Sequence, residues 1–84
     1  HISLYPNPVN GVLNFYLPER AYGSYSYQLI DQRGVAMIKG DMNFVQDRFS
    51  VDTWDLANGV YYVIIAHDGQ PIAQRKVVVM NRRR

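Results

Sequence analysis

Few side chains of this 84-residue chain have the chemistry that catalysis requires. A serine-type triad needs a histidine inside a pocket, and the only histidines are His1, at one end of the sequence, and His67, beside an Asp-Gly turn signal. A glycosidase needs two facing carboxylates, and Asp52 and Asp55 are close in sequence. Both lie at an expected strand-to-turn junction, where capping or solvation is the simpler role. We therefore predict that the domain is not an enzyme and has no catalytic residues.

Metal and cofactor chemistry also lacks a candidate motif. The chain contains no cysteine, which excludes disulfide bonds, zinc thiolate sites and a cysteine nucleophile. The sequence shows neither the alternating Asp/Asn pattern of a calcium loop nor a glycine-rich phosphate loop. We expect that the domain requires no metal and no cofactor.

Aromatic residues are the remaining candidates for ligand contacts. The chain has seven tyrosines, three phenylalanines and one tryptophan, and aromatic rings can stack on sugars or bases. Most of the tyrosines, however, fall at alternating positions of expected strands. Core packing explains that spacing more simply, and whether the domain also binds sugar stays open at this point.

The positive charge is concentrated at one end of the chain. Nine basic and seven acidic residues give a formal net charge of +2, and five of the basic residues lie in the last ten positions: Arg75, Lys76, Arg82, Arg83 and Arg84. Such a tail could contact nucleic acid, anionic lipid or an acidic protein groove. We interpret it as a solubilising terminus and expect no nucleic-acid partner. No apolar run approaches the roughly 20 residues of a membrane helix.

The elements that must position these residues are short β-strands separated by turns. Turn signals, among them Arg33-Gly34 as a two-residue hairpin turn, recur at the intervals typical of an all-β sandwich or barrel. Apolar and polar residues alternate with a period of two between them, and no window has a helical stripe. We predict one domain over residues 1–84, an antiparallel β-sandwich of about seven strands: 2–5, 12–17, 24–31, 35–39, 47–51, 60–66 and 72–80. Residues 41–46 are the least readable stretch.

One segment indicates a β-sandwich corner. Leu56 precedes a turn, Gly59 allows the backbone to reverse, and Tyr61 leads an apolar strand. We expect the Tyr61 ring to fill the end of the core while its hydroxyl bonds to upstream backbone, and Trp54 to cover one end of the core. The predicted core residues are Leu13, Phe15, Tyr27, Leu29, Leu56, Tyr61, Val63 and Ile65.

Four segments together form a recognisable pattern. They are Leu4-Tyr5-Pro6-Asn7-Pro8, Leu29-Ile30-Asp31-Gln32-Arg33-Gly34, Leu56-Ala57-Asn58-Gly59-Val60-Tyr61 and Arg75-Lys76-Val77-Val78-Val79. Their order and spacing resemble the type A C-terminal sorting domain of the type IX (Por) secretion system of Bacteroidota. The resemblance covers almost the whole chain, from about Leu4 to Met80. The extension that follows Met80 departs from the family, many of whose members end close to this strand.

The resemblance implies an Ig-like β-sandwich without catalytic activity, at the carboxyl end of an exported cargo protein. The expected partners are the covalently attached upstream cargo domain, the type IX outer-membrane translocon and its shuttle protein. A sortase-like cysteine protease is expected to remove the domain afterwards. The expected location runs from the periplasm to the outer membrane and cell surface, with possible release after cleavage. Because the chain begins at His1 without Met, we expect a fragment of a longer secreted protein.

The resemblance also distributes roles among residues. The residues expected to preserve the shape of the signal are Pro6, Asn7, Pro8, Asp31, Gly34, Leu56, Gly59 and Tyr61. Pro6 and Pro8 fix the backbone and Asn7 can cap their turn, while Asp31 and Gly34 frame a hairpin. The final strand is expected to be recognised by the secretion machinery: Arg75, Lys76, Val77, Val78, Val79 and Met80. The alternative is a non-catalytic Ig-like or fibronectin-like module that binds carbohydrate or protein.

Overall fold

The computed structural model describes residues 1–82, in which seven β-strands and no helix are found. The described part of the chain accordingly contains no helix that could cross a membrane. Each predicted strand is present, and its observed ends lie within two residues of the predicted ends. The strands are β1 (Ser3–Tyr5), β2 (Val12–Tyr16), β3 (Tyr25–Ile30), β4 (Ala36–Asp41), β5 (Arg48–Asp52), β6 (Gly59–His67) and β7 (Gln70–Val79).

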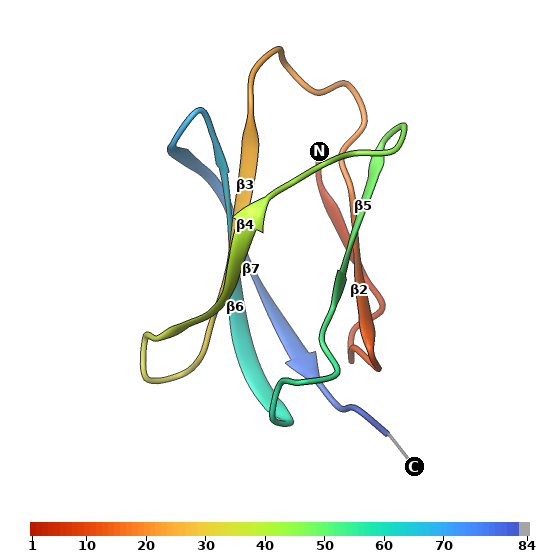
Figure 1. The fold of residues 1–84 in the computed structure, drawn as a ribbon, viewed down its shortest axis with the longest axis vertical. Coiled ribbons are helices and arrows are strands. Elements are labelled where there is room, and N and C mark those ends of the chain that lie inside the picture. Colours follow the sequence, from red (N-terminus) through yellow and green to blue (C-terminus); the bar gives the residue numbers. More distant parts are fainter. Residues whose placement is uncertain (83–84) are drawn as a thin grey trace.

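The strands form two antiparallel sheets that pack face to face (Figure 1). The smaller sheet has the order β1-β2-β5, and the larger sheet has the order β4-β3-β6-β7. β6 lies between β3 and β7, as expected of a strand that is apolar on both faces. The structure thus confirms the predicted all-β architecture, consistent with an Ig-like β-sandwich.

The core lies between the two sheets, because every second residue of each strand points inward. Phe15 of β2 is at its centre, with ring centroids 5.8 Å from Tyr27 and 5.7 Å from Phe49. All eight predicted core residues are buried. The prediction missed further buried residues, among them Val9, Met42, Thr53, Val77 and Val79. Met42 belongs to the stretch that the sequence left unreadable, where no alternation identifies an inward face.

Two local expectations were wrong. The β3–β4 hairpin has three residues, Gln32 to Gly34, between the paired Asp31 and Val35 rather than a two-residue turn. Gly34 has a φ of +88°, as the last position of such a loop requires. Trp54 does not cover the core: its partly buried ring lies directly against the backbone of Gly11, where a Cβ would overlap the indole.

Candidate recognition strand and its clasp

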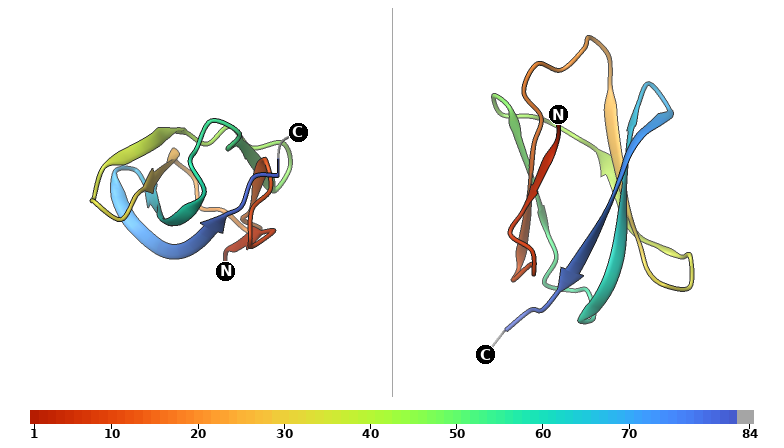
Figure 2. Two further views of the ribbon diagram at one scale, coloured as in Figure 1. Left: turned by 90° about the horizontal axis from the view of Figure 1, so that it is seen from below. Right: turned by 180° about the vertical axis from the view of Figure 1, so that it is seen from behind.

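The candidate recognition strand is β7, at one edge of the larger sheet (Figure 2). Within residues 1–82 its one strand neighbour is β6, with Tyr62 opposite Lys76 and Val60 opposite Val78. Of the predicted recognition residues, Val77 and Val79 are buried in the core at 1% and 0% exposure. Lys76 and Val78 instead alternate onto the outer face of the sheet. The strand therefore has a structural face and a face that a partner can touch.

The outer edge of β7 is covered over its last residues by residues 7–9, which we call the clasp. Asn7 Nδ2 donates to the Lys76 carbonyl oxygen at 3.3 Å, and Asn7 Oδ1 accepts the Val78 N–H at 2.9 Å. Val9 N–H donates to the Val78 carbonyl at 2.7 Å, and Met80 N–H donates to the Val9 carbonyl at 2.8 Å. Asn7 thus does not cap its own turn, as the sequence suggested, but takes the place of a neighbouring strand.

The other half of the same edge is open. The Lys76 carbonyl and both Val78 backbone groups point away from β6. In an antiparallel strand the N–H and the carbonyl of one residue point to the same side, and this side alternates from each residue to the next. The N–H groups of Gln74 and Lys76 therefore also point outward, and neither has a partner among residues 1–82. Pro71, near the start of β7, has no N–H to offer. The open edge is consequently short.

Asn81 holds the segment that follows β7, a role that could not be read from the sequence. Its Nδ2 donates to the Thr53 carbonyl at 2.7 Å, its Oδ1 accepts the Gly11 N–H at 2.8 Å, and its own N–H donates to Asn58 Oδ1 at 2.8 Å. Arg82 N–H also donates, to Asn10 Oδ1. A carboxamide serves both as donor and acceptor, so this side chain joins the segments of Thr53 and Gly11 to the end of the last strand. Of the basic tail, Arg83 and Arg84 lie outside the described residues.

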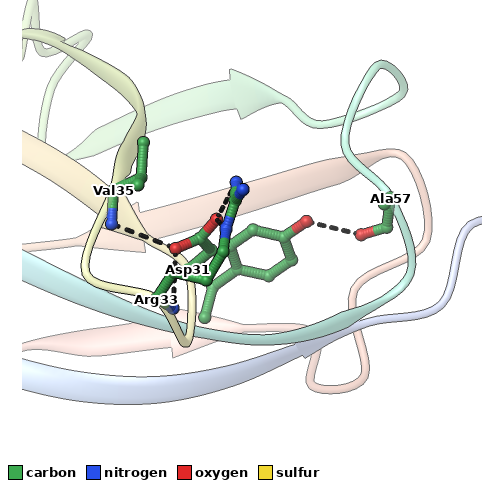
Figure 3. Close-up of polar contacts among 5 residues, drawn as sticks. Asp31, Arg33, Val35 and Ala57 are labelled. Carbon is green, nitrogen blue, oxygen red and sulfur yellow. Dashed lines mark hydrogen bonds and ion pairs between the residues drawn. The ribbon is translucent and has the colours of Figure 1, made fainter.

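Tyr61 makes the predicted corner. Its hydroxyl donates to the Ala57 carbonyl at 2.6 Å (Figure 3), and its ring is buried together with Leu56. Burial raises the pKa of Tyr61 above its usual value, and the nearby carboxylate of Asp31 adds to this shift. The hydroxyl therefore keeps its proton and acts as a donor.

Asp31 organises the β3–β4 hairpin, as predicted from its spacing to Gly34. One carboxylate oxygen accepts the N–H groups of Arg33 at 2.9 Å and Val35 at 3.0 Å, and the other pairs with the Arg33 guanidinium at 2.7 Å (Figure 3). The Val35 N–H, followed by the Arg33 side chain, lowers the pKa of Asp31 below its usual value. These contacts shape the turn.

The residue types of a serine triad meet at the other end of the sandwich, but not in a catalytic arrangement. Ser24 Oγ lies 3.4 Å from an Asp68 carboxylate oxygen, while His67 Nε2 contacts the Tyr22 carbonyl at 2.8 Å. A triad requires the histidine between serine and carboxylate, and no such serine–histidine bond exists within residues 1–82. The same range holds no group of three His, Asp or Glu residues that could bind a metal ion.

Comparison with known proteins identifies the family. The family model described as "Secretion system C-terminal sorting domain" matches residues 3–80, a range that includes all seven strands and the clasp. A search of curated proteins found no match. Because the match covers nearly the whole chain, the chain belongs to the secretion system C-terminal sorting domains, the sorting signals of the type IX secretion system.

Proposed function

We propose that this sorting signal is of type A, from a member of the Bacteroidota, and that residues 75–80 are the part that the secretion machinery reads. The observation that carries the proposal is the position of β7. It lies at an edge of the larger sheet, and its outer face carries the exposed Lys76 and the half-buried Val78. The other edge strand among the segments of the resemblance, β1, has only three residues. A terminal edge strand is also the element that a partner reaches with least disturbance of the core.

Within residues 75–80 we assign two different roles. Val77 and Val79 fill the core, so they maintain the strand in place and are not available to a partner that binds the folded domain. Lys76 and Val78 lie on the outer face beside Tyr62 and Val60. They form the surface that we propose is read, a small apolar area with one positive charge.

Docking by addition of a full strand is the less favoured route for the folded domain. Strand addition uses unpaired backbone groups, and those of Val78 and Met80 are already bonded to the clasp. A partner strand would first have to displace Asn7 and Val9. Contact through the side chains of Lys76 and Val78 needs no such rearrangement.

The proposed partners of the domain follow from export through the type IX secretion system. Family membership shows involvement with the type IX machinery and export toward the cell surface or beyond. We propose further that the 84 residues form one domain attached to an upstream cargo protein, and that the outer-membrane translocon and a shuttle protein bind it. A sortase-like cysteine protease would then remove it. In this role the domain needs no catalytic group of its own.

The test is a fusion of the domain to a fluorescent reporter that carries an export signal, in a bacterium with this secretion system. We expect the fusion at the cell surface or in the medium and the reporter without the domain in the periplasm. If the fusion also stays in the periplasm, the sorting proposal is wrong. A fusion whose domain ends at Gln74 would lack residues 75–80, but it would also lack the buried Val77 and Val79. Loss of its export would therefore not distinguish a missing signal from a damaged core.

A further inference from the structure

A hollow of about 690 Å³ lies beside β5, far along the chain from the clasp and β7. Its lining comes from β5, from the connection between β4 and β5, and from one outward side chain of β2: Tyr16, Asn43, Val45, Gln46, Arg48 and Ser50 are among its residues. Figure 1 shows this connection crossing between the two sheets at the end of the sandwich opposite the C-terminus. The volume is within the range of small-molecule sites.

The wall of the hollow is held in a fixed shape. Val45 and Arg48 exchange backbone hydrogen bonds at 2.9 and 3.1 Å around a two-residue turn. Arg20, from a neighbouring loop, donates to the Gln46 carbonyl at 2.8 Å and pairs with Asp47 at 3.4 Å. Its guanidinium also lies 3.9 Å from the centre of the Phe44 ring. A ligand would therefore meet a wall that is formed before it binds.

The hollow presents polar groups that the domain itself does not use. The Tyr16 hydroxyl, the carboxamides of Asn43 and Gln46, and the Arg48 guanidinium have no partner within residues 1–82. Ser50 adds its backbone N–H and carbonyl groups. The backbone groups of Arg48 point away from β2 and bond to Val45, and those of Ser50, two residues further along β5, point in the same direction. These donors and acceptors line the hollow together with Tyr16, a residue that is 39% exposed.

We propose that this hollow binds a saccharide. Sugar rings combine apolar C–H faces, which stack on an aromatic ring, with pairs of neighbouring hydroxyls, which planar carboxamide and guanidinium groups can bind through two hydrogen bonds. Tyr16 supplies the stacking ring, and Asn43, Gln46 and Arg48 supply the planar polar groups. A peptide strand fits less well, because Val45 already occupies the outward backbone groups of Arg48 and leaves only a short edge.

Charge indicates which saccharides bind best. Arg20 pairs with Asp47, the one acidic residue of the lining, so among the described residues Arg48 is left as the unpaired charge of the hollow. A guanidinium binds a carboxylate through two parallel hydrogen bonds. We therefore expect a sugar chain with carboxylate groups to bind more tightly than a neutral one. This site shares no residue with β7 or the clasp, so it is independent of the proposed sorting role.

The test is affinity electrophoresis of the 84-residue chain in native gels that contain polygalacturonate or, separately, neutral dextran. We expect retardation in polygalacturonate, at least about tenfold weaker binding for Tyr16→Ala, and weaker binding for Arg48→Gln. Tyr5→Ala is the matched control, since Tyr5 is also 39% exposed on the outer face of the smaller sheet but does not line the hollow. It should migrate like the unchanged chain.

Two results would overturn the proposal: no retardation of the unchanged chain in polygalacturonate, or equal retardation of the Tyr16→Ala and Tyr5→Ala variants. Equal migration of Arg48→Gln and the unchanged chain would overturn the role of the guanidinium. A circular-dichroism melt of each variant shows whether it is folded. In the reporter fusion, Tyr16→Ala should leave export unchanged, which separates this proposal from the sorting role.

Discussion

Asn7 and Val78 are 71 residues apart in the sequence, and Asn7 Oδ1 accepts the Val78 N–H at 2.9 Å. The same side chain donates to the Lys76 carbonyl, so one carboxamide satisfies two outward backbone groups of β7. This contact ties the first turn of the domain to its last strand. A strand edge that would otherwise be free to pair with other chains is thereby partly closed.

Replacing Asn7 by alanine should loosen this edge. Two exposed hydrogen bonds are lost, so the free energy of unfolding should fall by about 1 kcal/mol, and hydrogen exchange of the Val78 N–H should accelerate. Asn43→Ala is the control, because the exposed Asn43 side chain has no hydrogen-bond partner in the described part of the chain. Equal stability of the two variants in urea denaturation would contradict the role given to Asn7.

Two substitutions at Tyr61 separate its hydrogen bond from its packing. Tyr61→Phe removes the bond to the Ala57 carbonyl and should cost about 0.5–1.5 kcal/mol of stability. Tyr61→Ala also empties the corner and should cost about 3–5 kcal/mol, a large part of the total stability of a small domain. Thermal melts monitored by circular dichroism give both values. An unchanged melting temperature for Tyr61→Ala would refute the corner assignment.

Asp31 should make stability depend on pH in the acid range. The Val35 N–H and the Arg33 side chain hold the pKa of Asp31 below its usual value. The stabilisation is therefore fully present above about pH 4, where the carboxyl of the unfolded chain is also ionised, and it is lost as the pH falls through the lower folded-state pKa. The difference in unfolding free energy between the unchanged domain and Asp31→Asn should shrink in that range. A difference that is constant from pH 7 to pH 2 would argue against these contacts.

Gly11 and Gly34 test the packing of Trp54. Their φ values are nearly equal, +89° and +88°, so alanine costs about 1–2 kcal/mol of backbone strain at either position. Only at Gly11 would the new Cβ overlap the Trp54 ring, whereas nothing lies within 4 Å of the position at Gly34. Gly11→Ala should therefore destabilise the domain more than Gly34→Ala. Equal urea midpoints for the two variants would show that Trp54 moves away without cost.

The sequence predicted those features that depend on neighbouring residues. Alternation located Leu13, Phe15 and the other residues of the inner faces, and the spacing of Leu56, Gly59 and Tyr61 revealed the corner. Asp31 was likewise readable, because its hydrogen-bond partners lie within four residues of it.

Contacts between distant segments could not be predicted in this way. Asn7 and Asn81 are polar residues beside turns or ends, and only the folded sandwich brings their partners within reach. Val9 is a single apolar residue between turn signals, and its burial depends on the bridge to Val79. The same limit applies to the hollow beside β5, because Tyr16 and Arg48 become neighbours through the pairing of β2 with β5.

The most direct test of the central claim compares two lysines on the outer face of the same sheet. Lys76 is on β7, and Lys39 is on β4, at the opposite edge; both are exposed. The reporter fusion is made with Lys76→Glu plus Val78→Ser or with Lys39→Glu, and melts confirm that each purified domain is folded. The measurement is the fraction of reporter at the cell surface and in the medium. We predict that the Lys76 and Val78 variant accumulates in the periplasm while the Lys39 variant is exported normally; equal export of both folded variants would contradict recognition through the final strand.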